Sequence, residues 1–285
     1  MARVNKKKSL FRKLLLAFIF FSFIAGIVFG SYKIYRHYHP TIEEQLELAW
    51  QETDMDKEHK KYIKKFQKTQ DPEKILYMVQ NYKKYPIDIL KYVNDDIDRF
   101  DYGYKYPKRK NKEYTKDLKE KEVKTLTHLL QWDTRWGYQY YGEAPISKTG
   151  CAPTCLSMVL SYLKQDPSLT PSYIAKYSEK NDFYVKGAGS AWNLLPAISK
   201  KVGVGCTQIQ VSKNDITKAL KEKHPVILSV NPGDFTRTGH FIVLKGINKD
   251  GTIQVLDPNS KKNTKKSWKI NTLLKQTAAA YEFYK

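Results

Sequence analysis

The sequence predicts an α+β fold for residues 121–285, preceded by a basic tail and membrane-spanning segment at 1–38 and a small helical spacer at 39–120. Three observations support this prediction. An uncharged run near the N-terminus is long enough to cross a bilayer. A stretch rich in Lys, Glu and Tyr follows it, almost without Gly and broken by prolines. Beyond residue 121, an apolar amphipathic helix precedes several β-rich runs joined by turn residues.

The N-terminal segment combines a basic tail with an apolar run. Residues 1–30 contain six Lys and Arg and no acidic residue, and Leu14–Gly30 is uncharged. The basic flank favours a cytoplasmic N-terminus, although Lys33 and Arg36 on the far side weaken the charge asymmetry. We predict a single-pass membrane anchor with the remaining chain outside the cytoplasm. The alternative is secretion after signal cleavage, for which FGSYK is a poor site.

The chain is strongly basic, with a net charge of +21, and residues 121–285 hold 24 basic and 12 acidic residues. A basic surface can bind nucleic acid, an anionic membrane or an anionic polymer. Because the chain is predicted to lie outside the cytoplasm, we expect no nucleic acid partner. An anionic cell-wall polymer stays open as a partner.

The spacer shows helix starts but no group of catalytic residues. Thr41 precedes two glutamates, and Asp71 precedes Pro72 and a glutamate, which are patterns typical of helix N-termini. Pro86 opens a third apolar segment, and the charged stretch Lys105–Lys119 is predicted to be a linker. The interpretation is a stalk or packing domain.

The most informative stretch is Gly150–Lys164, GCAPTCLSMVLSYLK. Pro153 suits an early helical position, and the apolar residues beyond it recur at helical spacing. Cys151 is therefore predicted to lie at a helix N-terminus, where unpaired N–H groups and the helix dipole favour the nucleophilic thiolate. Cys155 lies one turn further along and is predicted to be a core residue.

Short helices and strands are predicted after this helix. The predicted helices are Thr170–Ser178, a segment ending at Ile198 after the glycine-rich turn Gly187–Trp192, and Asp215–Glu222. The predicted strands are Pro225–Val230, Phe241–Gly246 and Thr252–Leu256. Asp250-Gly251 between the last two strands indicates a hairpin.

This hairpin predicts that a histidine and a carboxylate are neighbours. His240 precedes one strand and Asp257 follows its partner. Antiparallel pairing about the turn brings these two ends to the same sheet edge, with the strands about 5 Å apart. An Asp there can accept the imidazole N–H and fix its tautomer, as a base beside a cysteine nucleophile requires.

Other candidate residues have simpler interpretations. The three cysteines provide no disulfide framework, and Cys206 is interpreted as strand or turn filler. Without a CxxC, an HExxH or clustered histidines, we expect no metal and no cofactor. His128 lies near Gln131 without an obvious carboxylate partner, and His224 is interpreted as a surface residue. Trp192, behind a glycine-rich turn, is either a substrate-groove residue or a core tryptophan.

Three motifs, GCAPTCLSMVLSYL, TGHFIVLKGI and VLDPNS, resemble those of the C39-like cysteine peptidases, which are related to double-glycine peptidases and have a papain-like fold. The resemblance covers about residues 124–285. It implies a helix bearing Cys151 as nucleophile, packed on an antiparallel sheet bearing His240 as base and Asp257 as orienting acid. It also implies that Gln131 forms an oxyanion hole with the Cys151 backbone N–H.

The chain departs from the family pattern at two points. Ala152 replaces the glycine that usually follows the cysteine. Gln131 precedes Cys151 by 20 residues, further than in transporter-linked members, so Gln139 is an alternative to it.

The resemblance implies peptide-bond cleavage by thiol acyl transfer, with a peptide or protein substrate. Gly189 and Trp192 are candidates for substrate binding. Two alternatives stay open: a peptidoglycan-directed cysteine amidase or endopeptidase, and an inactive cell-surface binding module. The Lys-rich, disulfide-poor, anchor-first organisation resembles Gram-positive surface proteins. Because the chain has no transporter segments and is predicted to face outward, double-glycine leaders are not expected as substrates.

Overall fold

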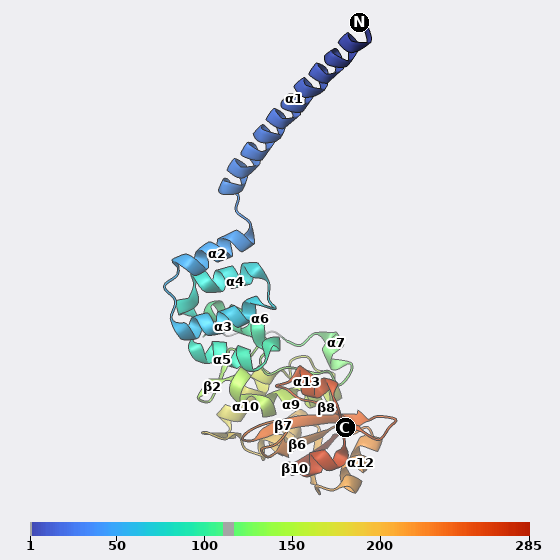
Figure 1. The fold of residues 1–285 in the computed structure, drawn as a ribbon. Helices are drawn as coiled ribbons and strands as arrows, with labels where there is room; N and C mark the ends of the chain where they lie inside the picture. Colours follow the sequence, from blue (N-terminus) through green and yellow to red (C-terminus); the bar gives the residue numbers. More distant parts are fainter. Residues whose placement is uncertain (1, 111–116) are drawn as a thin grey trace. The chain divides into compact units, whose positions relative to one another are not determined.

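The computed structural model describes residues 2–110 and 117–285, with side chains from residue 15 onward (Figure 1). Contacts divide the chain into two compact units that meet between Ile87 and Asp88. The C-terminal unit has mixed helix and antiparallel sheet, which confirms the predicted α+β class. The division falls inside the stretch assigned to the spacer.

The N-terminal helix α1 spans Ala2–Tyr38. Its segment Leu15–Tyr38 is long and apolar enough to cross a membrane, and its side chains are not covered by the rest of the chain. The predicted apolar helix is therefore confirmed. The side chains of the basic tail, Arg3 to Lys13, lie outside the described residues.

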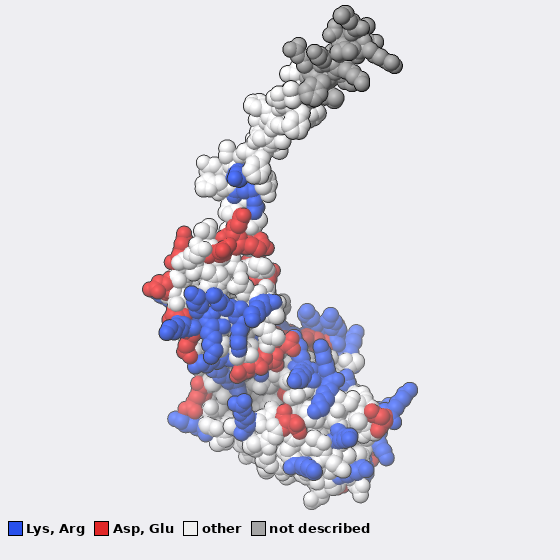
Figure 2. Space-filling view, viewed as in Figure 1, with Lys and Arg blue, Asp and Glu red and all other residues white. Residues whose placement is uncertain are grey.

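The rest of the first unit contains three α-helices, α2 (Ile42–Glu52), α3 (Lys57–Gln67) and α4 (Pro72–Gln80), and a 3-10 turn (Tyr82–Lys84). Thr41 and Asp71 cap α2 and α4, as the sequence predicted, and Thr41 forms a full capping box with Glu44. Helix α3 was not predicted. Its buried face packs into the unit, while its outer face carries exposed lysines that form the basic patch over α3 in Figure 2: Lys57, Lys60, Lys61, Lys64, Lys65 and Lys68.

The second unit begins with α5 (Ile87–Asp95), a short 3-10 turn (Ile97–Arg99) and α6 (Phe100–Arg109). The predicted linker Lys105–Lys119 is wrong for residues 105–109, which complete α6. Tertiary packing explains the difference, because Phe100 and Tyr102 on α6 are buried and the helix continues past Pro107, which itself donates no backbone hydrogen bond. Residues 111–116 lie outside the described residues, and α7 (Glu120–Val123) follows.

One six-stranded antiparallel sheet organises the second unit, in the order β5-β10-β6-β7-β8-β9. Its strands are β5 (Gly205–Ile209), β6 (Val226–Val230), β7 (His240–Ile247), β8 (Ile253–Leu256), β9 (Ser267–Trp268) and β10 (Thr277–Tyr284). The predicted β7–β8 hairpin is present, with Val243 opposite Leu256. Strand β10 was not predicted and lies between β5 and β6.

Helices cover both faces of this sheet, and the central strand β6 is buried at every residue. In one hydrophobic core, α9 (Cys151–Lys164), α10 (Pro171–Lys180) and α11 (Leu194–Val202) pack against the sheet. In the other hydrophobic core, α12 (Lys213–Lys221) and α14 (Ile270–Leu274) pack against the sheet. The remaining elements are β1 (Tyr140–Tyr141), β2 (Ala144–Pro145), α8 (Ile146–Thr149), β3 (Tyr184–Val185), β4 (Gly189–Ser190) and α13 (Lys261–Lys265).

Candidate active site

Cys151 opens helix α9, and its position depends on the glycine before it. A Cβ on Gly150 would lie 2.4 Å from Ile146 Cγ2 and 2.6 Å from the Ile146 carbonyl oxygen, so only glycine allows α8 to turn this tightly into α9. Ala152, in the place of the usual family glycine, fits as a buried helical residue. Cys151 is half-buried as a residue, in contrast to the fully buried Cys155.

His240 and Asp257 meet at one edge of the sheet. His240 is the first residue of β7, and Asp257 directly follows β8. His240 Nε2 lies 2.8 Å from Asp257 Oδ1, and the two residues are only 7% and 1% exposed. The structure thus brings together the two side chains that the hairpin predicted to be neighbours.

The Asp257 carboxylate is held by three hydrogen-bond donors. Oδ1 accepts from His240 and from the Asn259 backbone N–H, at 2.8 and 2.9 Å, and Oδ2 accepts from Asn263 Nδ2 at 2.7 Å. Burial disfavours the charged carboxylate, but these donors, with His240 first, outweigh it and keep the pKa of Asp257 below its ordinary value. The carboxylate is therefore ionised and fixed in orientation.

The pKa values of Cys151 and His240 shift in opposite directions. Burial opposes ionisation of the thiol, but the His240 side chain, aided by backbone groups of Phe241 and Ala152, lowers the pKa of Cys151. Burial also opposes the imidazolium, but Asp257 and then Cys151 raise the pKa of His240. Because Nε2 is bonded to Asp257, Nδ1 is the nitrogen that can bond the thiol. Both shifts favour the thiolate–imidazolium form of the pair.

Backbone hydrogen bonds hold the loop that follows β8. The Asp257 N–H donates to Thr264 Oγ1 at 2.9 Å, and His128 Nε2 donates to the Asp257 carbonyl at 2.6 Å. His128 thus contacts the site without touching a carboxylate. Sequence reasoning missed Asn263 and Thr264, because nothing in KKNTKK distinguishes them from a surface turn.

Gln131 lies next to this loop and to the segment before Cys151. Its N–H donates to the Pro258 carbonyl at 2.8 Å, and its Nε2 donates to the Ser147 carbonyl at 2.7 Å. The side chain is 2% exposed, and Oε1 has no hydrogen-bond partner in the described part of the chain. Gln139, the alternative, is also buried, and its carbonyl accepts from the Ile146 N–H.

Gly189, in another hairpin, lies close to the residues that precede α9, and Trp192 follows that hairpin. The predicted turn Gly187–Trp192 contains β4, which pairs with β3, so it is more ordered than a flexible turn. Gly189 has a φ of +86°, and a Cβ there would lie 3.8 Å from the Thr149 carbonyl, two residues before Cys151. Trp192 is 44% exposed and so is not a core tryptophan.

The other two thiols have raised pKa values. Cys155 is fully buried, its Sγ donates to the Phe241 carbonyl, and burial raises its pKa well above the ordinary value. Burial raises the pKa of Cys206, in β5, to about 12. Neither thiol is therefore a competing nucleophile.

His224 lies outside this site, half-buried rather than fully on the surface. Its Nδ1 is 2.6 Å from Glu282 Oε1, and Glu222 lies within the same small group. These three side chains have metal-ligating atoms within 4.8 Å of one another, but the hydrogen bond between His224 and Glu282 accounts for their arrangement.

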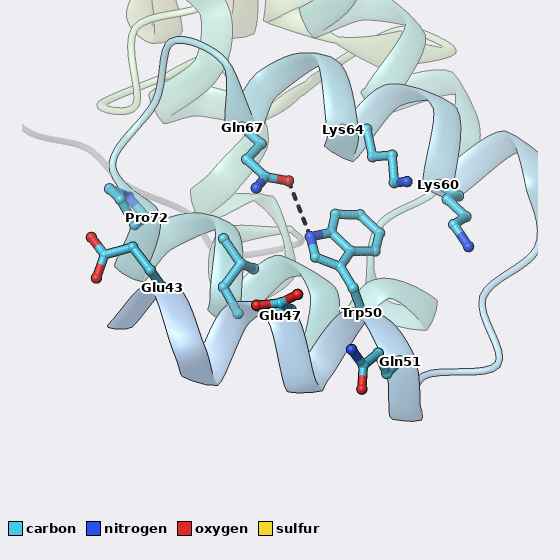
Figure 3. Close-up of a pocket in the computed structure, with 9 residues that line it drawn as sticks. Glu43, Glu47, Trp50, Gln51, Lys60, Lys64, Gln67 and Pro72 are labelled. Atoms are coloured by element: carbon cyan, nitrogen blue, oxygen red, sulfur yellow. Dashed lines mark hydrogen bonds between the residues drawn. The ribbon is translucent and has the colours of Figure 1, made fainter. Parts of the chain in front are cut away.

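The helical unit has a groove of about 560 Å³ between α2 and α3. Figure 3 shows the Trp50 indole between the two helices, its Nε1 donating to Gln67 Oε1 at 3.0 Å. Lysines line one side and glutamates the other, and the lining residues are Glu43, Leu46, Glu47, Trp50, Gln51, Lys60, Lys64, Gln67 and Pro72. Since none of these is a Cys or His, the groove is not a candidate for thiol chemistry.

An α+β domain with a thiol at a helix N-terminus and an imidazole and a carboxylate at a sheet edge is the architecture of cysteine-peptidase-like proteins. Residues 123–285 match the Peptidase_C39 like family, and the chain belongs to this family. A search of curated proteins found no match. Among solved structures, the peptidase domain of Streptococcus ComA, a bi-functional ABC transporter involved in a quorum sensing pathway, is similar at 17% identity and a TM-score of 0.39. The similarity covers 48% of this chain and 92% of that domain.

Proposed function

We propose that this protein is a membrane-anchored, extracytoplasmic cysteine peptidase in which Cys151 is the nucleophile, His240 the general base and Asp257 the orienting acid. The observation that carries the proposal is the position of His240, whose Nε2 bonds the buried Asp257 carboxylate while its side chain lowers the pKa of the Cys151 thiol. A nucleophile, a base and a group that orients the base are the parts that thiol acyl transfer needs. Membership of the C39-like family supports the same reaction class.

In the proposed reaction, the Cys151 thiolate attacks the substrate carbonyl carbon and forms a tetrahedral oxyanion. The Cys151 N–H at the start of α9 and the second N–H of the Gln131 amide, whose first bonds Ser147, are the proposed oxyanion donors. The His240 imidazolium then protonates the leaving amine as the C–N bond breaks, which leaves a thioester. His240, now neutral, takes a proton from water, the hydroxide displaces the thiolate, and the acid product leaves.

The remaining parts of the proposal concern location and substrate. We assign residues 1–38 to a tail and anchor, helices α2 to α4 to a spacer, and 121–285 to the peptidase domain. Gly189 and Trp192 are proposed to contact substrate beside Cys151. The exposed lysines of α3 and the basic C-terminal region favour an anionic environment such as a cell-wall polymer, so a peptidoglycan-directed reaction is the second candidate.

Alkylation with iodoacetamide at pH 6 tests the nucleophile. We expect one fast-reacting thiol, because the pKa of Cys151 is lowered while those of Cys155 and Cys206 are raised. Labelling followed by peptide mass spectrometry should lose the fast site in Cys151→Ala and keep it in Cys155→Ala, a matched control one turn along the same helix. Equal labelling of both variants, or no fast site in the wild type, would contradict the proposal.

Substrate classes are then compared with the wild-type protein and Cys151→Ala. Cysteine-dependent cleavage of a peptide library supports a general peptidase, and cysteine-dependent release of soluble fragments from purified peptidoglycan supports the wall-directed reaction. If the thiol is labelled but neither substrate is cleaved, the inactive binding module is the better description.

Deletion of residues 1–38 tests the anchor. Because Leu15–Tyr38 is the described segment able to cross a membrane, we expect the full chain to sediment with membranes and the truncated chain to stay soluble. The mass of the expressed full-length protein distinguishes an uncleaved anchor from a cleaved signal peptide. Membrane sedimentation of the truncated chain would show that another surface causes attachment.

A further inference from the structure

Residues 88–110 precede the family match at 123–285, yet they contact both loops that hold the candidate site. They comprise α5 from Asp88 onward, the 3-10 turn and α6. Arg99 contacts Asn259 in the loop after β8, and Tyr92 contacts Ser147 in α8.

Arg99 contacts the loop that carries Asp257. Its guanidinium donates to Asn259 Oδ1 at 3.2 Å and to the Asn259 carbonyl at 3.4 Å, and also to the Tyr92 carbonyl at 3.0 Å. The Arg99 side chain is buried and lies over the Tyr92 ring, 4.2 Å from its centre. Since the Asn259 N–H donates to Asp257 Oδ1, Arg99 fixes the residue that helps to orient the carboxylate.

Tyr92 contacts the segment that carries Gln131 and leads to Cys151. Its hydroxyl donates to the Ser147 carbonyl at 2.7 Å, the same oxygen that accepts from Gln131 Nε2 at 2.7 Å. A carbonyl oxygen has two lone pairs, so the two donors together saturate it. Tyr92 therefore fixes the acceptor that orients the Gln131 amide.

The segment is held firmly enough to position these groups. Tyr102 on α6 stacks on Tyr138 at 4.5 Å, and the Tyr138 hydroxyl donates to the Tyr102 carbonyl at 2.8 Å. Ser147 Oγ donates to the Tyr102 hydroxyl at 2.8 Å. A Cβ on Gly103 would lie 2.3 Å from Val93 Cγ2, so α5 and α6 approach as closely as glycine permits.

We infer that residues 88–110 are a working part of the active site rather than spacer: Arg99 positions Asp257 through Asn259, and Tyr92 positions Gln131 through the Ser147 carbonyl. This inference rests on the proposed peptidase function. Both are positioning residues, because neither contacts Cys151 or His240 in the described contacts. The active unit thus begins about 35 residues before the family match.

Arg99→Met in the full chain tests the first contact. With Asp257 less well aligned, we expect kcat/KM to fall roughly tenfold and the alkaline limb of its pH profile to move to lower pH, because His240 loses part of the interaction that raises its pKa. The matched control is Asp98→Asn, which breaks the exposed 3.5 Å ion pair between the same segment and Lys261 without touching Asn259. It should keep the wild-type rate and profile.

Tyr92→Phe removes only a hydroxyl, which lies 2.7 Å from the Ser147 carbonyl oxygen and, at 3.4 Å, further from Asn259 Oδ1. We expect kcat to fall about fivefold at unchanged KM. The hydrogen bond from Gln131 to the oxyanion, which loss of the hydroxyl weakens, forms only in the transition state. Alkylation of Cys151 should stay at the wild-type rate, since Gln131 does not contact the thiol in this scheme. The control is Asp88→Asn, which breaks the 2.8 Å ion pair between α5 and Lys148 and leaves the Ser147 carbonyl in place.

A structural role alone would lower the melting temperature of Arg99→Met and Tyr92→Phe without moving the pH profile or kcat. Folded variants with the wild-type profile and kcat would overturn the inference. If Arg99→Met does not fold, Tyr92→Phe still decides. Failure of the proposed function gives a different result, namely no fast thiol at Cys151 in the wild-type protein.

Discussion

Replacing His240 with alanine is expected to lower kcat/KM by about 10²–10⁴-fold, the range that a general acid–base residue contributes. The variant should also slow alkylation of Cys151 at pH 6. Burial raises the pKa of the thiol, and His240 is the main group that lowers it. Without His240, only backbone groups of Phe241 and Ala152 favour the thiolate. The pKa of Cys151 therefore rises, and the midpoint of alkylation rate against pH moves to higher pH.

His224→Ala is the matched control for this experiment. His224 is also partly buried and also bonds a carboxylate, Glu282, but it lies outside the candidate site. Its removal should leave kcat/KM and the alkylation midpoint at wild-type values. If His240→Ala kept the low alkylation midpoint, the thiolate would owe its stability to the helix terminus, and His240 would not be the base.

The hairpin that carries His240 and Asp257 was predictable because its information is local. Asp250-Gly251 marks the turn, and antiparallel pairing then fixes which strand ends are neighbours. Cys151 was predictable for a similar reason, since the apolar spacing after Pro153 places it at the start of a helix. Helix caps at Thr41 and Asp71 are likewise short-range signals.

Strand β10 was not predictable in this way. Its three consecutive alanines, Ala278 to Ala280, favour helix locally. The segment is a strand because it pairs on both sides, with β5 and with β6. Those partners lie far earlier in the chain, so no local pattern contains the information.

The residues that position Asp257 could not be predicted from the sequence for the same reason. Asn263 follows a lysine pair that resembles a surface turn, and Arg99 lies 160 residues from Asn259. Their importance depends on contacts between distant segments. The end of α6 was predicted to be linker because the stretch from Lys105 onward is charged, whereas α6 continues to Arg109 and its buried residues pack into the unit.

Asp257→Asn is expected to narrow the pH profile of kcat/KM from both sides. The acid limb reports protonation of the thiolate, and the alkaline limb reports loss of the imidazolium proton. Asp257 is the leading group that raises the pKa of His240 against burial, so removing its charge moves the alkaline limb to lower pH. A less stable imidazolium stabilises the thiolate less, so the acid limb moves to higher pH. Each limb should move by about one pH unit, equivalent to roughly 1.4 kcal/mol.

Asp257→Asn and Asp257→Ala separate charge from orientation. The asparagine Oδ1 can still accept from His240 and from the Asn259 N–H, and the Asn263 amide can turn its oxygen toward the new NH₂ group. The asparagine variant should therefore keep a plateau rate within about tenfold of wild type, whereas alanine loses the acceptor as well and should fall by about 10²-fold or more. Stopped-flow alkylation across pH 4–10, with kcat/KM on the same samples, measures both effects. A full-width profile in Asp257→Asn would mean that the Asp257 charge does not act on the pair, and an equal loss in both variants would mean that the oriented acceptor contributes nothing beyond that charge.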